Sequence, residues 1–246
     1  MASTSVTAKE LFKAGAHFGH RTSYWHPKMA PYIHGQKGSV HIIDLIQTEQ
    51  LLATATAAIE EIASQGKQVL FVGTKRQAKA IIKNHAERAG MPYVTERWLG
   101  GMLTNHQTMN ARVAKMKKLE SQMESGELAD KYNKLEVQQF QEEIDSLRTI
   151  FGGISELSGV PGAIVIADVA EDHVAVAEAA RLKVPIFAIC DTNIDPTPVT
   201  YPIPANDDAI NTIDLVVSTL ATAVEQGAKT ASAKTAAPEA DKKEEK

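Results

Sequence analysis

The sequence predicts a three-layer α/β/α protein, in which a parallel sheet lies between helices and an antiparallel, coiled-coil-like helical hairpin is inserted. A length of 246 residues with 43% hydrophobic residues suits one large α/β domain with an insertion. Short apolar runs alternate with longer amphipathic stretches, which is the pattern of βαβ units. The run 163–167 (Ala-Ile-Val-Ile-Ala) is apolar throughout, as expected of a strand covered on both faces.

The individual elements follow from apolar runs and from helix-capping signals. Thr7 and Glu10 have the spacing of a capping box at the start of a helix, and Thr74 and Gln77 repeat it after a strand and Gly73. The expected strands are 40–44, 68–72, 92–95, 163–168 and 185–190, with an edge strand near 201–203. The expected helices are 7–14, 47–64, 74–89, 172–181 and 207–225.

Residues 105–149 interrupt the alternation of strands and helices. Apolar residues spaced three and four apart begin at Met109, pass the turn signal Ser125-Gly126 and continue to Phe151, which predicts two antiparallel helices that project from the body. We therefore expect an α/β domain formed by 1–104 and 150–225, and an inserted hairpin over 105–149. Residues 226–246 hold almost no large apolar side chain and are expected to be disordered.

Charge is divided unevenly along the chain. Residues 1–118 carry 16 Lys and Arg against 7 Asp and Glu, a net of +9, and residues 119–246 carry 10 against 23, a net of −13. The two parts together give the overall charge of −4. This asymmetry favours one surface that meets a polyanion and another that faces solvent or a protein partner.

The cysteine count and the hydropathy bear on the compartment. Cys190 is the single cysteine, so no intramolecular disulfide can form, which is typical of a reducing cytoplasm. No stretch approaches the ~20 apolar residues that a membrane-spanning helix needs. We expect a cytoplasmic protein without a membrane partner.

The most informative run in the chain is 97–105, Arg-Trp-Leu-Gly-Gly-Met-Leu-Thr-Asn. Gly100 and Gly101 let the backbone approach another surface closely, and Thr104 with Gln107 again has the spacing of a capping box. A second run, 17–29, interleaves histidine, arginine and lysine with aromatic residues. Folded RNA offers phosphates to cations and exposed bases to aromatic rings, so both runs are candidate RNA contacts.

Together these two runs resemble the signature stretches of the second protein of the small ribosomal subunit, in its bacterial form. The resemblance continues through 69–75, 151–154, 191–193 and 206–208 and covers about residues 5–225 in collinear order. It implies a flavodoxin-like strand order and a structural role, without catalysis or a cofactor. The implied partners are small-subunit ribosomal RNA and other small-subunit proteins, including ribosomal protein one, which a member of this family helps to dock.

The residues expected to contact RNA come from the two runs, from the basic start of the helix after Gly73, and from the first arm of the hairpin. They are His17, Gly19, His20, Arg21, Tyr24, Trp25, Lys28, Lys75, Arg76, Arg97, Trp98, Asn105, Arg112 and Lys115.

Several alternatives remain open at this point. Five histidines between 17 and 41 raise a zinc site, although their spacing matches no compact zinc pattern. Acidic residues at predicted strand ends (Asp168, Asp191 and Asp207) raise a structural cation. Because ligands of doubly wound sheets bind at the carboxyl ends of the strands, an enzyme acting there on a phosphorylated small molecule is the competing class of function. An RNA chaperone outside the ribosome is the third.

Overall fold

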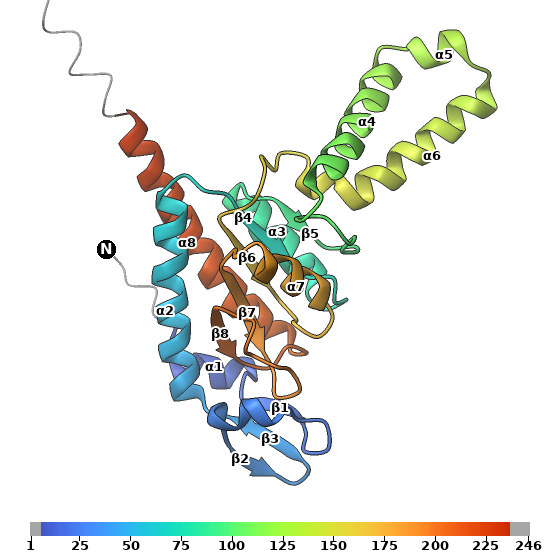
Figure 1. Ribbon diagram of the computed structural model, residues 1–246. Coiled ribbons are helices and arrows are strands. Elements are labelled where there is room, and N and C mark those ends of the chain that lie inside the picture. The colour runs from blue at the N-terminus through green and yellow to red at the C-terminus, as the bar shows by residue number, and fades with distance from the viewer. Residues whose placement is uncertain (1–5, 237–246) are drawn as a thin grey trace, which may run out of the picture.

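The computed structural model describes residues 6–236 and contains a five-stranded parallel sheet (Figure 1). Its strand order is β5-β4-β6-β7-β8, so the first strand along the chain lies inside the sheet and the second lies at its edge. This is the flavodoxin-like order, and the predicted fold class is confirmed. The strands are β4 (Val69–Val72), β5 (Tyr93–Val94), β6 (Ala163–Ile166), β7 (Ile186–Cys190) and β8 (Tyr201–Pro204).

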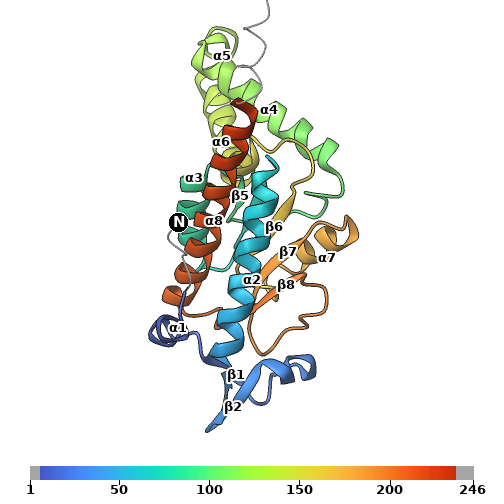
Figure 2. The same ribbon diagram turned by 90° about the vertical axis from the view of Figure 1, so that its left-hand side faces the viewer.

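Helices cover both faces of this sheet because successive strand side chains point to opposite sides. Val69 and Phe71 of β4 join a first core, and Leu70 and Val72 join a second. The view turned by 90° shows the long helices α2 and α8 side by side on the first face (Figure 2). That face carries α1 (Ala8–Ala14), α2 (Leu45–Ser64), α3 (Lys79–Ala89) and α8 (Ile210–Ala236), and the second face carries α7 (His173–Arg181).

A second, smaller sheet lies at one end of the body and was not expected. It is antiparallel, in the order β1 (Phe18–Arg21), β3 (Val40–Ile43), β2 (Ile33–Lys37), with a 3-10 helix, Pro27–Tyr32, between its first two strands. Residues 40–44 were expected in the parallel sheet, and this expectation was wrong. The partners of Val40 are Arg21 and Lys37, whose mixed, polar segments gave no strand signal of their own.

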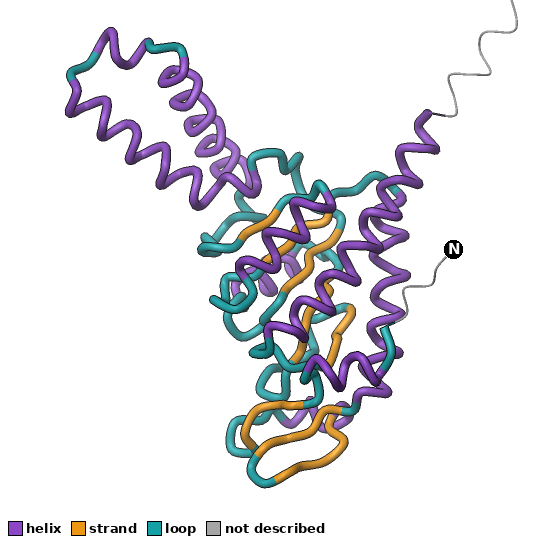
Figure 3. The backbone as a smooth tube through the Cα atoms, turned by 180° about the vertical axis from the view of Figure 1, so that it is seen from behind, coloured by secondary structure: helices purple, strands orange, loops and turns teal. Residues whose placement is uncertain are grey.

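The inserted segment projects from the body, as Figure 1 and the view from behind in Figure 3 both show. It consists of α4 (His106–Glu124), a short α5 (Glu127–Lys131) and α6 (Lys134–Phe151), followed by the 3-10 helix Gly152–Ile154. Its root is not independent of the body. Met109, Val113, Met116 and Phe151 belong to the second core, together with Val72 of the sheet.

Two of the three expected capping boxes do not form. The helix expected from Thr74 begins at Lys79, because the Thr74 backbone N–H and hydroxyl donate to Asp172. The Thr104–Gln107 capping box does not form, since Thr104 donates to a residue of α7. The box of Thr7 and Glu10 is present.

The last helix continues beyond the point where disorder was expected to begin. α8 runs to Ala236, and Gly227 packs so closely on α2 that a Cβ there would lie 2.4 Å from the Glu60 carbonyl oxygen. Gly227 therefore permits close packing of the two helices at this point, which composition alone does not reveal. The remainder of the expected tail, 237–246, lies outside the described residues. Within 6–236, the structure contains no helix of the length and hydropathy that crossing a bilayer requires.

Candidate nucleic-acid interface

Most of the predicted site residues lie along the carboxyl edge of the parallel sheet or on the small sheet beside it, whereas Arg112 and Lys115 lie on α4. Lys75 and Arg76 follow β4, and Arg97 follows β5. The small sheet packs on the end of β7, where the backbone N–H of His20 donates to Thr192 Oγ1 at 2.8 Å. A Cβ at Gly19 would lie 2.6 Å from Thr192 Cγ2, so this glycine allows the two sheets to approach each other.

Lys75 points inward at this edge rather than toward solvent. Its ammonium lies 2.7 Å from Asp207 Oδ1, 2.7 Å from Asp208 Oδ1 and 3.1 Å from Asp168 Oδ2. Burial acts to lower the pKa of Lys75, but hydrogen bonds to Asp207 and Asp208 outweigh it and hold the pKa above its ordinary value. Burial, with the charges of Asp168 and Asp191, raises the pKa of Asp207 to about 7.

His20 links the small sheet to the same cluster. Its Nδ1 lies 3.2 Å from Asp191 Oδ1, and this hydrogen bond raises the pKa of His20 to about 8. One ligand atom each from His20, Asp191 and Asp207 lie within 4.8 Å of one another, so these side chains could hold a cation. Among residues 6–236, His20 is the one of the five N-terminal histidines that belongs to a group able to bind a metal ion. The ring of His17 instead contacts the rings of Phe12 and Phe18.

The run 97–105 forms a loop closed around Glu178, a buried residue of α7 that the sequence did not single out. Glu178 Oε1 accepts from Trp98 Nε1 at 3.1 Å and Gly101 N at 2.7 Å. Glu178 Oε2 accepts from Leu103 N, Thr104 N and Thr104 Oγ1, each at 3.0 Å. Burial acts to raise the pKa of Glu178, but these donors outweigh it and lower the pKa.

The loop therefore divides into an inner and an outer part. Met102 and Leu103 enter the second core, and Trp98 packs against it with its indole N–H bound to Glu178. Arg97 and Asn105 are exposed. Arg97 also lines a hollow of about 240 Å³ with Thr74 of the neighbouring strand end.

Exposure and ion pairing separate the predicted cations. Lys28 is exposed but pairs with Asp195 at 2.7 Å, and Lys115 pairs with Glu143 across the hairpin. Tyr24 is 70% exposed and Trp25 40% exposed. Among residues 6–236, five exposed guanidinium groups have no carboxylate within ion-pair distance, namely those of Arg21, Arg76, Arg97, Arg112 and Arg181. Arg181 is the last residue of α7 and precedes Leu182, which lines a hollow where the strands begin, so it lies away from the other four.

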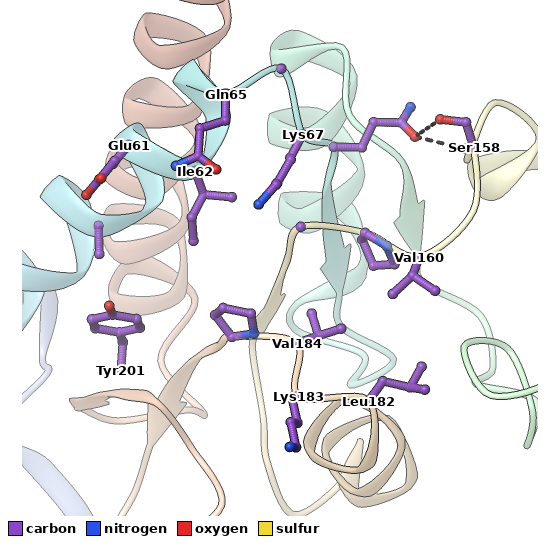
Figure 4. A pocket seen from close by; sticks show the side chains of 16 residues that line it. Glu61, Ile62, Gln65, Lys67, Ser158, Val160, Leu182, Lys183, Val184 and Tyr201 are labelled. Atoms are coloured by element: carbon purple, nitrogen blue, oxygen red, sulfur yellow. Dashed lines mark hydrogen bonds between the residues drawn. The ribbon is translucent and has the colours of Figure 1, made fainter.

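A hollow of about 690 Å³ lies at the opposite edge, where the strands begin (Figure 4). Figure 4 shows Lys67 before β4, Val160 before β6 and Lys183 after α7 around it. None of the predicted site residues lines this hollow. The expected contacts with RNA and the hollow are thus on opposite edges of the sheet.

The fold and the edge define a flavodoxin-like α/β protein whose carboxyl edge presents exposed guanidinium and aromatic groups. The family model of ribosomal protein S2 matches residues 11–227. The chain is 50% identical to "Small ribosomal subunit protein uS2" of Chloroherpeton thalassium, over 88% of this chain and 86% of that protein. It is 48% identical to the protein of the same name from Picosynechococcus sp., over 90% and 86%, and 43% identical to that of Corynebacterium urealyticum, over 96% and 88%. The chain belongs to the ribosomal protein S2 family.

Proposed function

We propose that this protein is a structural constituent of the small ribosomal subunit that binds small-subunit ribosomal RNA in the cytoplasm. The observation that carries the RNA contact is that four of the five exposed arginines without carboxylate partners lie at the carboxyl edge of the sheet or on α4. Three of them, Arg97, Arg76 and Arg21, follow the carboxyl edge of the sheet, and Arg112 extends the series onto α4. Guanidinium groups bind phosphate through paired N–H donors, and exposed rings such as Tyr24 and Trp25 stack on bases.

The remaining predicted cations have different roles in this proposal. Lys28 and Lys115 already neutralise carboxylates, so they would contribute to RNA binding only by exchanging partners. Lys75 stabilises the buried end of the sheet and does not face RNA. His20 attaches the small sheet, which presents Arg21 and Tyr24.

We also propose that the protein helps to dock ribosomal protein one, as the family resemblance implies. Phe12, His17 and Phe18 form a row of ring contacts on the surface, stacked in the first pair and tilted in the second, with centroids 4.4 and 4.0 Å apart. Phe12 is 61% exposed and Phe18 48% exposed, and a protein partner would remove this apolar area from water. Capture of ribosomal protein one by subunits carrying Phe12→Ala and Phe18→Ala tests this contact, and unchanged capture would place it elsewhere.

The competing enzyme would need an anion site at the start of α3. The Thr74 N–H and hydroxyl, which would face a phosphate there, donate instead to the Asp172 carboxylate. Three further carboxylates, of Asp168, Asp207 and Asp208, surround the Lys75 ammonium. A small phosphate ester at this inner position would meet carboxylates, whereas RNA phosphates would meet the exposed guanidinium groups of Arg76 and Arg97. The geometry therefore favours the RNA-binding role.

Salt dependence of binding tests the proposed RNA contact. Each phosphate contact that is lost should flatten the slope of log affinity against log salt by roughly 0.7 to 0.9. We expect this for Arg21→Ala and Arg97→Ala with protein-free small-subunit ribosomal RNA. Arg88→Ala is the matched control. Arg88 lies in the last turn of α3 and already pairs with Glu225 at 2.6 Å.

Sedimentation provides the readout in assembled particles. The wild-type chain should migrate with the small subunit through a moderate salt wash, and Arg21→Ala and Arg97→Ala should reduce this fraction more than Arg88→Ala does. If the two variants keep the parent slope and the parent fraction, the carboxyl edge is not the RNA interface. Recovery outside the subunit would instead favour the chaperone alternative.

A further inference from the structure

The loop 97–105 satisfies its backbone in an unusual way. The N–H groups of Gly101, Leu103 and Thr104 donate to the single carboxylate of Glu178. The Trp98 indole and the Thr104 hydroxyl add two more donors, so five donors meet one side chain. A carboxylate offers about four lone-pair sites, so this carboxylate is saturated.

The loop has two backbone hydrogen bonds of its own, from Met102 N to the Leu99 carbonyl and from Asn105 N to the Gly101 carbonyl, and Glu178 adds a charged acceptor to them. A buried N–H without an acceptor costs about 1–3 kcal/mol, and hydrogen bonds to a charged acceptor are the stronger class. Gly101 has φ of +93°, and a Cβ there would lie 3.2 Å from the Asn105 side chain. The backbone thus takes a conformation that glycine allows and that Glu178 selects.

The geometry of the loop couples Glu178 to the candidate interface on both sides. Arg97 precedes the first donor, Trp98, by one residue, and Asn105 follows the last donor, Thr104, by one residue. Asn105 N donates to the Gly101 carbonyl at 2.8 Å, and α4 begins at the next residue. The position of Glu178 therefore determines where the Arg97 guanidinium and the first turn of the hairpin lie.

We propose that Glu178 is the positioning residue of the RNA interface: from inside the body, it holds the loop 97–105 so that Arg97 and the start of α4 face RNA. Glu178 itself is 8% exposed and does not contact RNA. This role rests on the proposed RNA contact of the loop. It predicts that the benefit of Arg97 to binding depends on a residue that lies about 80 positions away in the sequence.

The test is a double-mutant cycle of Glu178→Gln and Arg97→Ala. An amide turns an NH₂ group toward at least one set of donors, whichever way it is oriented, so Glu178→Gln releases part of the loop with little change in volume. Affinity is measured with protein-free small-subunit ribosomal RNA at one salt concentration. Hydrogen exchange of the Gly101, Leu103 and Thr104 amides is measured on the free protein. Ile59→Val, in the core on the opposite face of the sheet, is the control for a general loss of stability.

We expect Arg97→Ala to weaken binding roughly tenfold in the otherwise wild-type chain, as for the loss of one charge-assisted hydrogen bond. In the Glu178→Gln chain the same change should weaken binding by less than about twofold. Independent residues would instead give the same effect in both chains, to within about twofold. The loop amides should exchange faster in Glu178→Gln and not in Ile59→Val.

The two proposals fail in different ways. If Arg97→Ala leaves the affinity of the wild-type chain unchanged, the RNA contact of this loop is refuted. If Arg97→Ala keeps its full effect in the Glu178→Gln chain, or the loop amides exchange at the parent rate, the positioning role is refuted. Should Glu178→Gln not fold, Thr104→Val removes one of the five donors at constant shape, and a reduced Arg97 effect in that chain is the expected result; a full effect would overturn the proposal.

Discussion

Replacing Lys75 with methionine should destabilise the protein far more than the same replacement of Lys79, whose ion pair lies at the surface. The ammonium of Lys75 lies 2.7 Å from Asp207 and 3.1 Å from Asp168, both buried. At an effective dielectric constant of about 20, a contact at 2.7 Å contributes roughly 6 kcal/mol of attraction before the cost of desolvation. Removal of one partner of a buried pair leaves the other charge uncompensated, and the net loss is about 3–5 kcal/mol.

The loss of stability in Lys75→Met should be larger at high pH than at low pH. The pKa of Asp207 in the folded protein is about 7, above its ordinary value of 3.8, so protonated Asp207 favours the folded state. That contribution is complete below about 3.8 and is lost as the pH rises through about 7. Without Lys75 the pKa of Asp207 rises further, because the cation that opposes the shift is gone. Lys75→Met should therefore cost least near pH 5 and most near pH 8.

Urea unfolding of the parent and the variant at pH 5 and pH 8 measures this effect. Lys79→Met is the matched control, since Lys79 pairs with Glu96 at the surface and such pairs contribute only about 0–1 kcal/mol. Asp207→Asn in the Lys75→Met chain should restore part of the stability at pH 8. If Lys75→Met costs no more than Lys79→Met at pH 8, the buried ion cluster does not stabilise the end of the sheet.

Three further predictions concern the same framework. The pKa of His20 is raised to about 8 from 6.5, so the stability that protonated His20 contributes is complete below pH 6.5 and is lost as the pH rises through 8. His20→Gln should remove up to about 2 kcal/mol of this pH dependence, measured as the free energy of unfolding against pH. Gly153→Ala should lower the free energy of unfolding by about 3 kcal/mol or more, because a Cβ would lie 2.2 Å from a backbone oxygen of β5. Gly100→Ala is the control, since Gly100 has open space around it, and it should change stability by less than about 0.5 kcal/mol in the same assay. Replacing 117–140 by a short glycine linker should leave the melting temperature of the body near that of the parent. Removing 105–149 should lower the melting temperature, because the root of the hairpin belongs to the second core. Equal melting temperatures of the two shortened chains would show that the root does not support the body.

The contacts of Glu178 also decide which variant of the loop 97–105 is informative. A combined change of Arg97 and Trp98 would mix two effects, because the Trp98 indole donates to Glu178 and packs on the second core. Arg97→Ala alone removes the exposed cation and leaves the loop closed. The single variant is therefore the informative one for RNA binding.

The sequence by itself determined the fold class and the positions of the main elements. Runs such as 163–167 are apolar on both faces, and only a strand between two layers of helices can bury such a run. The hairpin was also readable, because its spacing of three and four persists over two long segments. The capping box of Thr7 was correct since both of its members lie within one helical turn, and local patterns of this kind need no tertiary information.

The tertiary structure decided which of the predicted cations are exposed and which hold the fold. Lys75 looks like a free cation in the sequence, yet its partner Asp207 is 132 positions away. Glu178 looks like an ordinary helix residue, yet it organises a loop more than 70 positions earlier. The small sheet was missed because β1 and β2 are short and polar and gain stability only from pairing with β3 and from contact with Thr192. Local sequence fixes backbone preference, but hydrogen bonds and ion pairs between distant segments depend on how the strands are ordered, and that order exists only in the folded chain.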